Sequence, residues 1–135
     1  MCIQIQNPFF KSSDINEKYW PVHGFKNENK LYVALERISS KKDENNTFNF
    51  QIEGVDLATI SNPDETPEKW NITYTHFMDD KTIIPGIAFV KKENYIYIFS
   101  VLEGKEYKNH PIILLRIPSD KILKPKENLE YYSKE

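Results

Sequence analysis

The stretch PVHGF at residues 21–25, followed by KLYVAL at residues 30–35, decides the fold of this chain. It returns later as PGIAF at residues 85–89, followed by YIYIF at residues 95–99. Each copy is a short proline-led run, a polar turn and a run of β-branched and aromatic residues, which predicts a β-hairpin. A β unit that repeats after some tens of residues predicts a propeller blade or a related array.

The two copies align closely. The prolines at positions 21 and 85, and the phenylalanines at positions 25 and 89, are 64 residues apart. Tyr32 and Tyr97 are 65 residues apart, so the simplest alignment places one extra residue in the second turn. On this alignment Phe25 and Phe89 are equivalent residues.

Composition favours a soluble β-rich globular chain and argues against two classes of partner. Of 135 residues, 39% are hydrophobic and 13% aromatic, with eight Tyr and eight Phe. The net charge of −2 provides no basic field for nucleic acid or an anionic membrane surface, and neither is expected as a partner. No apolar run approaches the length of a membrane span, and the first residues lack the pattern of a signal peptide. Cys2 is the one cysteine, which predicts neither a disulfide framework nor a thiolate metal site and leaves the compartment open.

The first copy predicts four strands in meander order between residues 20 and 77, the content of one blade. Gly54 marks a bulge in the third of them. The charged run at residues 39–46 is expected to be a solvated loop, and the proline-containing segment at residues 62–67 a connector. The predicted strands are 20–25, 31–38, 48–60 and 70–75.

The second copy predicts a second blade between residues 84 and 133. Pro111 and Pro118 bracket six residues, which is too short for a stable helix and suits a buried strand. The tail at residues 129–133 occupies the place of the outer strand. The predicted strands are 84–89, 95–102, 111–117 and 129–133.

Several motifs occur in a familiar order. They are YWPVHGF at 19–25, KLYV at 30–33, GVDLA at 54–58, the segment 62–70, YIYI at 95–98, LRIP at 115–118 and LEYY at 129–132. In this order they resemble bacterial five-bladed β-propeller domains of unknown function, related to arabinan-cleaving and other furanosidase-like glycoside hydrolases. The likeness extends over residues 19–133.

The resemblance implies an all-β fold: two four-stranded antiparallel blades of an incomplete five-bladed β-propeller, in one partial domain over residues 1–135. Full-length relatives are often secreted. The blade expected to carry a catalytic carboxylate has no counterpart here, so no catalytic residue is carried over. Two blades cannot close a ring, and each terminal blade is expected to leave one apolar face open. Self-association, or a chain that supplies the missing blades, is therefore expected.

Ligand groups in a propeller gather where the innermost strands begin. This predicts substrate-binding roles for Trp20, His23, Asp79 and Asp80, with Trp20 stacking on a sugar ring and His23 donating to a hydroxyl or helping to hold an ion. The competing interpretation makes Trp20 and His23 packing residues. Adjacent carboxylates point opposite ways along a strand, which favours an acidic turn over the acid and base of a glycosidase.

Other charged side chains yield weaker hypotheses. His76, Asp79 and Asp80 could bind a divalent ion, but three ligands from one loop do not fill a calcium shell, and no metal site is predicted. No cofactor motif is present. Arg116, isolated among aliphatic residues, must find a carboxylate or backbone carbonyls, and Glu36 and Glu53 are the nearest candidates.

Three functions remain open from the sequence. The leading one is a glycoside-hydrolase-like propeller fragment that does not catalyse alone. The others are an active glycosidase assembled from several chains, and a non-enzymatic module that binds a protein or a carbohydrate.

Overall fold

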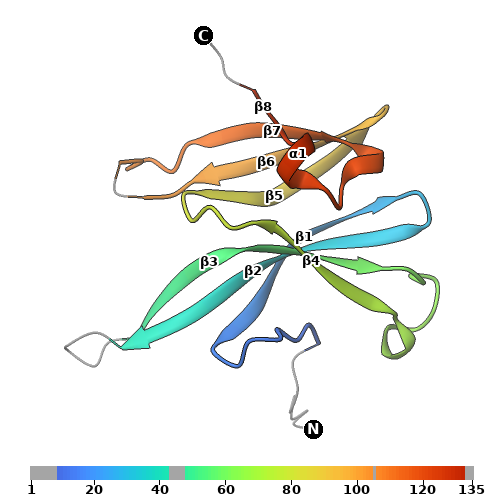
Figure 1. Cartoon of the computed structure of the whole chain (residues 1–135), viewed down its shortest axis with the longest axis horizontal. Coiled ribbons are helices and arrows are strands. Elements are labelled where there is room, and N and C mark those ends of the chain that lie inside the picture. Colours follow the sequence, from blue (N-terminus) through green and yellow to red (C-terminus); the bar gives the residue numbers. More distant parts are fainter. Residues whose placement is uncertain (1–8, 43–47, 105, 133–135) are drawn as a thin grey trace, which may run out of the picture.

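The structure, a computed structural model, describes residues 9–42, 48–104 and 106–132 and folds them into two four-stranded antiparallel sheets (Figure 1). Each sheet is a simple meander in which consecutive strands are neighbours, so the predicted architecture of two four-stranded sheets is confirmed. The first sheet contains β1 (Glu17–Asn27), β2 (Lys30–Lys42), β3 (Phe48–Ile60) and β4 (Ile72–Met78). The second contains β5 (Ile83–Lys92), β6 (Tyr95–Leu102), β7 (Ile112–Pro118) and β8 (Glu130–Tyr132).

Helical structure in the described residues is confined to single turns. The predicted connector at residues 62–67 leads into η1 (Pro67–Lys69), and η2 (Ser119–Lys121) and α1 (Pro125–Asn128) lie between β7 and β8. Of the predicted solvated loop at residues 39–46, the first four residues extend β2, and 43–46 lie outside the described residues, as does position 133 of the predicted last strand. Within the described part of the chain, no helix is long and apolar enough to cross a membrane.

The two hairpins that carry the repeat close through turns of equal length. Asn27 pairs with Lys30, and Lys92 pairs with Tyr95, so both turns contain two residues. The first residue of each turn has a positive φ, 57° at position 28 and 56° at position 93. The prediction that the second turn contains one extra residue is therefore wrong.

The extra residue lies in the bulge of β5 instead. In β5, two residues lie between Pro85 and Ala88. The β6 residues that pair with Pro85 and Ala88 are Ser100 and Phe99, which are adjacent, so the two inserted residues have no partner in β6. In β1 the corresponding two residues lie opposite one residue, Ala34, in β2. Each β1 residue between the bulge and the turn therefore corresponds to the β5 residue 65 positions later in the sequence. A change of one residue reverses the direction of a side chain, so the partner of Phe25 in the repeat is Val90, not Phe89.

The hydrophobic core lies between the two sheets, and we call the sides that meet there the contact faces. The contact face of the first sheet contains Phe25, Tyr32, Ala34, Val55 and Leu57. That of the second contains Phe89, Ile96, Ile98, Leu115 and Ile117.

The strands β1 and β5 bring the sheets closest together. A Cβ atom at Gly86 would lie 2.8 Å from the Cβ of Ala34, so the backbone of β5 approaches β2 where only glycine fits. Toward the outer strands, α1 contacts both β4 of the first sheet and β7 of the second.

The opposite side of the first sheet, its back face, is also covered. Leu35, Ala58 and Ile60 on this face are fully buried. The rings of Tyr19 in β1 and Tyr74 in β4 stack with centroids 5.3 Å apart, which places them over the middle strands. The expectation that each sheet leaves an apolar face open is wrong for the first sheet, because the tyrosine pair covers that face.

Candidate functional site

Trp20 lies in an exposed aromatic pocket on β1. Its ring centroid is 5.5 Å from that of Phe50 in β3. The two rings border a shallow pocket of about 220 Å³, completed by Ile15, Asn16, Lys18, Ile38 and Ser40. Both rings remain accessible to solvent, with exposed fractions of 45% for Trp20 and 62% for Phe50. An accessible indole beside hydroxyl, amide and ammonium groups suits a ligand with one apolar and one polar side.

His23 connects the two sheets. Its Nδ1 accepts a hydrogen bond of 3.2 Å from the backbone N–H of Phe89, and its ring stacks on the Phe89 ring at 6.0 Å. An acceptor at Nδ1 leaves the proton of the neutral imidazole on Nε2. His23 therefore holds β1 against β5, and its Nε2–H is the group that could donate to a ligand.

Asp79 and Asp80 turn to different partners. Asp79 forms an ion pair with Arg37 of β2. Asp80 accepts hydrogen bonds from the Thr82 hydroxyl at 2.6 Å and the Thr82 backbone N–H at 2.8 Å. These bonds lower the pKa of Asp80, the hydroxyl bond having the larger effect. The two carboxylates thus serve a turn and an ion pair, and they do not face each other as an acid and a base.

The described contacts do not join any two of the four predicted site residues. Trp20 pairs across the strands with Glu36, and Arg37, the next residue along β2, holds Asp79. Neighbouring residues of a strand point to opposite faces, so Trp20 and the partner of Asp79 lie on opposite sides of the sheet.

A buried carboxylate that the sequence analysis passed over organises the back face. Asp56, 2% exposed, accepts a 2.6 Å hydrogen bond from the Tyr19 hydroxyl and lies 2.7 Å from His76 Nδ1 and 3.2 Å from Arg37 Nε. Burial, and secondarily the bond to Asp56, raises the pKa of Tyr19. The sequence did carry a signal for this cluster, because Asp56 is the one acidic residue in the mainly aliphatic run 55–60. A charge buried in such a run needs partners.

This cluster changes the interpretation of His76. The sequence offered His76 as an ion ligand together with Asp79 and Asp80, whereas its Nδ1 faces Asp56. Among the residues that the structure describes, no group of three or more His, Cys, Asp and Glu side chains is arranged to hold a metal ion.

Glu36 and Glu103 form a second arrangement that the sequence analysis did not identify. Glu36 lies on the same face as Trp20, and burial raises its pKa, with a further contribution from the negative charge of Glu103 at the end of β6. Glu103 is held by His110, whose Nδ1 lies 3.2 Å from its carboxylate. The negative charge of Glu103 thus adds to the effect of burial on the pKa of Glu36.

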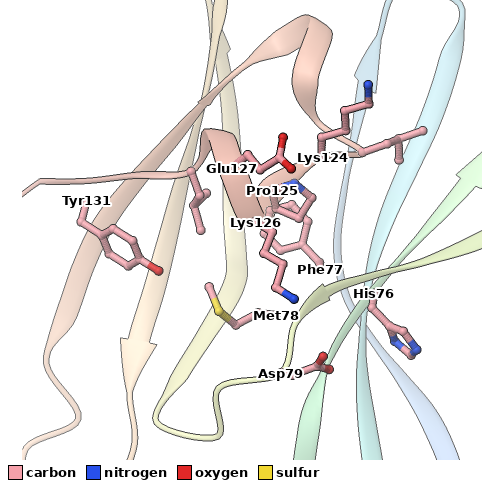
Figure 2. A pocket seen from close by; sticks show the side chains of 11 residues that line it. His76, Phe77, Met78, Asp79, Lys124, Pro125, Lys126, Glu127 and Tyr131 are labelled. Atoms are coloured by element: carbon pink, nitrogen blue, oxygen red, sulfur yellow. The ribbon is translucent and has the colours of Figure 1, made fainter.

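A larger pocket of about 750 Å³ opens between the end of β4 and the segment from α1 to β8 (Figure 2). Its apolar lining includes Phe77, Met78 and Leu129, and Lys126 and Tyr131 contribute polar groups from the second sheet's side. None of the predicted binding residues except Asp79 lines it.

Arg116 finds its carboxylate within its own sheet. Its Nε contacts Glu130 of β8, not Glu36 or Glu53 as the sequence suggested. The physical reason is register, because Arg116 and Glu130 are directly paired across β7 and β8.

These observations define an all-β protein of two stacked antiparallel meanders with an exposed aromatic pocket on the first sheet. A family model described as "Domain of unknown function (DUF5005)" matches residues 2–135, and the chain belongs to this family. No curated protein and no solved structure matches the chain.

Proposed function

We propose that the chain forms two adjacent blades of a β-propeller-like array with glycoside-hydrolase ancestry, and that it binds carbohydrate without catalysing its cleavage alone. The close approach of β1 and β5, together with α1 between the outer parts of the sheets, supports the blade arrangement. Propeller blades converge at their first strands and diverge toward their fourth.

The observation that carries the carbohydrate proposal is the pocket of Trp20 and Phe50. Sugar rings present C–H groups on one face and hydroxyls at the edge, which matches an accessible indole bordered by Asn16, Lys18 and Ser40. The engagement of Asp79 with Arg37, and of Asp80 with Thr82, favours binding over catalysis.

A titration with arabino-oligosaccharides, followed by calorimetry and by the fluorescence of Trp20, tests the proposal. Trp20→Ala should abolish binding, because stacking on the indole supplies most of the contact. Tyr131→Ala is the matched control, since it removes an exposed aromatic residue from the larger pocket. Binding that survives Trp20→Ala, or that is lost in Tyr131→Ala, would contradict the assignment of the binding site to the pocket of Trp20 and Phe50.

One observation favours a second candidate, an active glycosidase assembled from several chains. A glutamate with a raised pKa is the requirement for a general acid, and Glu36 has one beside a second carboxylate, Glu103. The assembled protein would then hydrolyse an aryl furanoside. Glu36→Gln and Glu103→Gln should each lower the rate by roughly 10²-fold or more. Equal rates in both variants and the unchanged chain would exclude this pair.

A further inference from the structure

The second sheet has an apolar side that points away from the first sheet, and we call it the open face. Directly paired residues of neighbouring strands share a face, and the ladders of β5 to β8 place one set of apolar and aromatic residues on this side. The open face contains Val90, Tyr95, Tyr97, Phe99, Val101, Ile112, Leu114, Arg116, Glu130 and Tyr132.

Through the repeat, the open face corresponds to the contact face of the first sheet. At the spacing of 65 that the turns establish, Phe25 corresponds to Val90, Ala34 to Phe99 and, through the next strand, Val55 to Ile112. The exposed fraction rises from 8% to 50%, from 0% to 38% and from 1% to 66% in these three pairs. Positions that bury the core in one sheet are thus apolar and exposed in the other, which is typical of a surface that binds another protein surface.

The single arginine of the open face is neutralised within it. Arg116 is ion-paired with Glu130, and its guanidinium lies 4.1 Å from the ring centroid of Tyr95 and 5.3 Å from that of Tyr132. Lys92, paired with Tyr95, lies at the rim beside the turn. Tyrosines and an arginine at the centre of a patch are the residues that protein interfaces favour. Because its charge is balanced, the centre of the patch can face an identical patch without repulsion.

Two features argue against a further sheet packing on the open face as the second sheet packs on the first. Where the two sheets meet, the Gly86 backbone lies against the small side chain of Ala34. Phe99 occupies the position of Ala34 on the open face, and its larger side chain blocks an equally close approach. A second copy could offer its back face, but Tyr19 and Tyr74 already cover it. Among the described residues, the open face is therefore the apolar face of a sheet that a second copy can contact without displacing Tyr19 and Tyr74.

We propose that the open face binds the open face of a second copy in a two-fold symmetric dimer. Three strands of about seven residues and the three-residue β8, at ~4.8 Å between strands and ~3.3 Å per residue, give a patch of about 400 Å². Two such patches bury about 800 Å², the size of a weak interface, so dissociation should occur in the micromolar range. The proposal goes beyond carbohydrate binding and does not depend on it.

Sedimentation velocity and light scattering on the full chain, from about 1 to 100 µM, test the proposal. The dimer fraction should rise with concentration. Phe99→Glu and Ile112→Glu each place an unpaired charge in the interface and should weaken the dimer by more than about tenfold. Ile15→Glu, a change at a residue that is 97% exposed and lies outside the open face, is the matched control and should leave the dimer intact. Circular dichroism establishes that each variant folds, and two independent variants guard against a failure of either one.

Three outcomes would overturn the proposal. They are a monomer at about 100 µM, a dimer that persists in both folded variants, and cross-links between copies that map outside the open face. A monomer that binds an apolar dye through the open face would instead indicate a sheet from another chain. Trp20→Ala should keep the dimer, so failure of the dimer and failure of carbohydrate binding are distinguishable.

Discussion

The ring of Phe25 in β1 meets the ring of Phe89 in β5 with centroids 4.5 Å apart and an interplanar angle of 36°. These two residues look equivalent in the sequence, but they are contact partners across the gap between the sheets. The shift of one residue at the β5 bulge turns Phe89 toward the first sheet. The bulge therefore decides which aromatic residues hold the two sheets together.

Removal of the Phe89 ring should loosen this junction. Phe89 is buried and contacts both Phe25 and His23, so Phe89→Ala should lower the free energy of unfolding by about 3–4 kcal/mol. Urea unfolding followed by circular dichroism measures the change. Phe50→Ala, which removes a mostly exposed ring, is the control and should cost less than about 1 kcal/mol. Equal losses in the two variants would contradict the assigned core.

Gly86 tests the close approach of the sheets. Its φ is 92°, and an added Cβ would lie 2.8 Å from the Ala34 Cβ, so Gly86→Ala should destabilise the fold by roughly 2–4 kcal/mol. Gly104 also has a positive φ, of 134°, but an added Cβ there finds its nearest neighbour at 3.8 Å. Gly104→Ala therefore isolates backbone strain from crowding and should cost only about 1 kcal/mol. Thermal unfolding of both variants makes the comparison.

Asp56 should be the most sensitive polar residue of the first sheet. Asp56→Ala leaves the Tyr19 hydroxyl and Arg37 without their buried partner and should cost about 3–5 kcal/mol. Asp120→Ala changes an exposed carboxylate and should have almost no effect. Chemical denaturation near pH 7 gives both values. A change below about 1 kcal/mol for Asp56→Ala would mean that the cluster does not stabilise the sheet.

The raised pKa of Glu36 predicts that the fold loses stability as the pH rises. Its folded-state pKa lies above the unfolded value, near 4.3, so the folded chain holds this proton more tightly. The stability that the neutral carboxyl provides is present at low pH and is lost as the pH rises through the folded pKa. Glu36→Gln should consequently raise the melting temperature at pH 7 and leave it unchanged well below pH 4. The gain is about 0.5 kcal/mol, because solvent screens a partly exposed group.

The sequence predicted the elements of the fold well and their mutual orientation poorly. Alternating residues and polar turns were sufficient for eight strands, and the prolines that bracket residues 112–117 correctly excluded a helix there. The equivalence of Phe25 and Phe89 failed because a bulge adds a residue without altering the turn. Periodicity reports which residues alternate, but an insertion inside a strand reverses the face that they occupy.

The candidate site was less predictable for the same physical reason. Trp20 was identified as a candidate for stacking on a sugar ring, but the pairing of Asp79 with Arg37 depends on how the chain leaves β4, which is separated from β2 by β3. The proximity of Glu36 and Glu103 depends on packing between sheets, which no spacing within the sequence encodes. Asp56 alone offered a local signal, as an acidic residue among aliphatic ones.

The stacked pair of Tyr19 and Tyr74 has a consequence for the motions of the first sheet. Edge strands normally fray independently, because each is held by one neighbour only. Here the rings join the two edge strands over the middle pair, so opening of β1 removes the cover of β4, and the reverse holds as well. Both edges should then exchange their amide hydrogens in one shared opening event, with similar protection in β1 and β4.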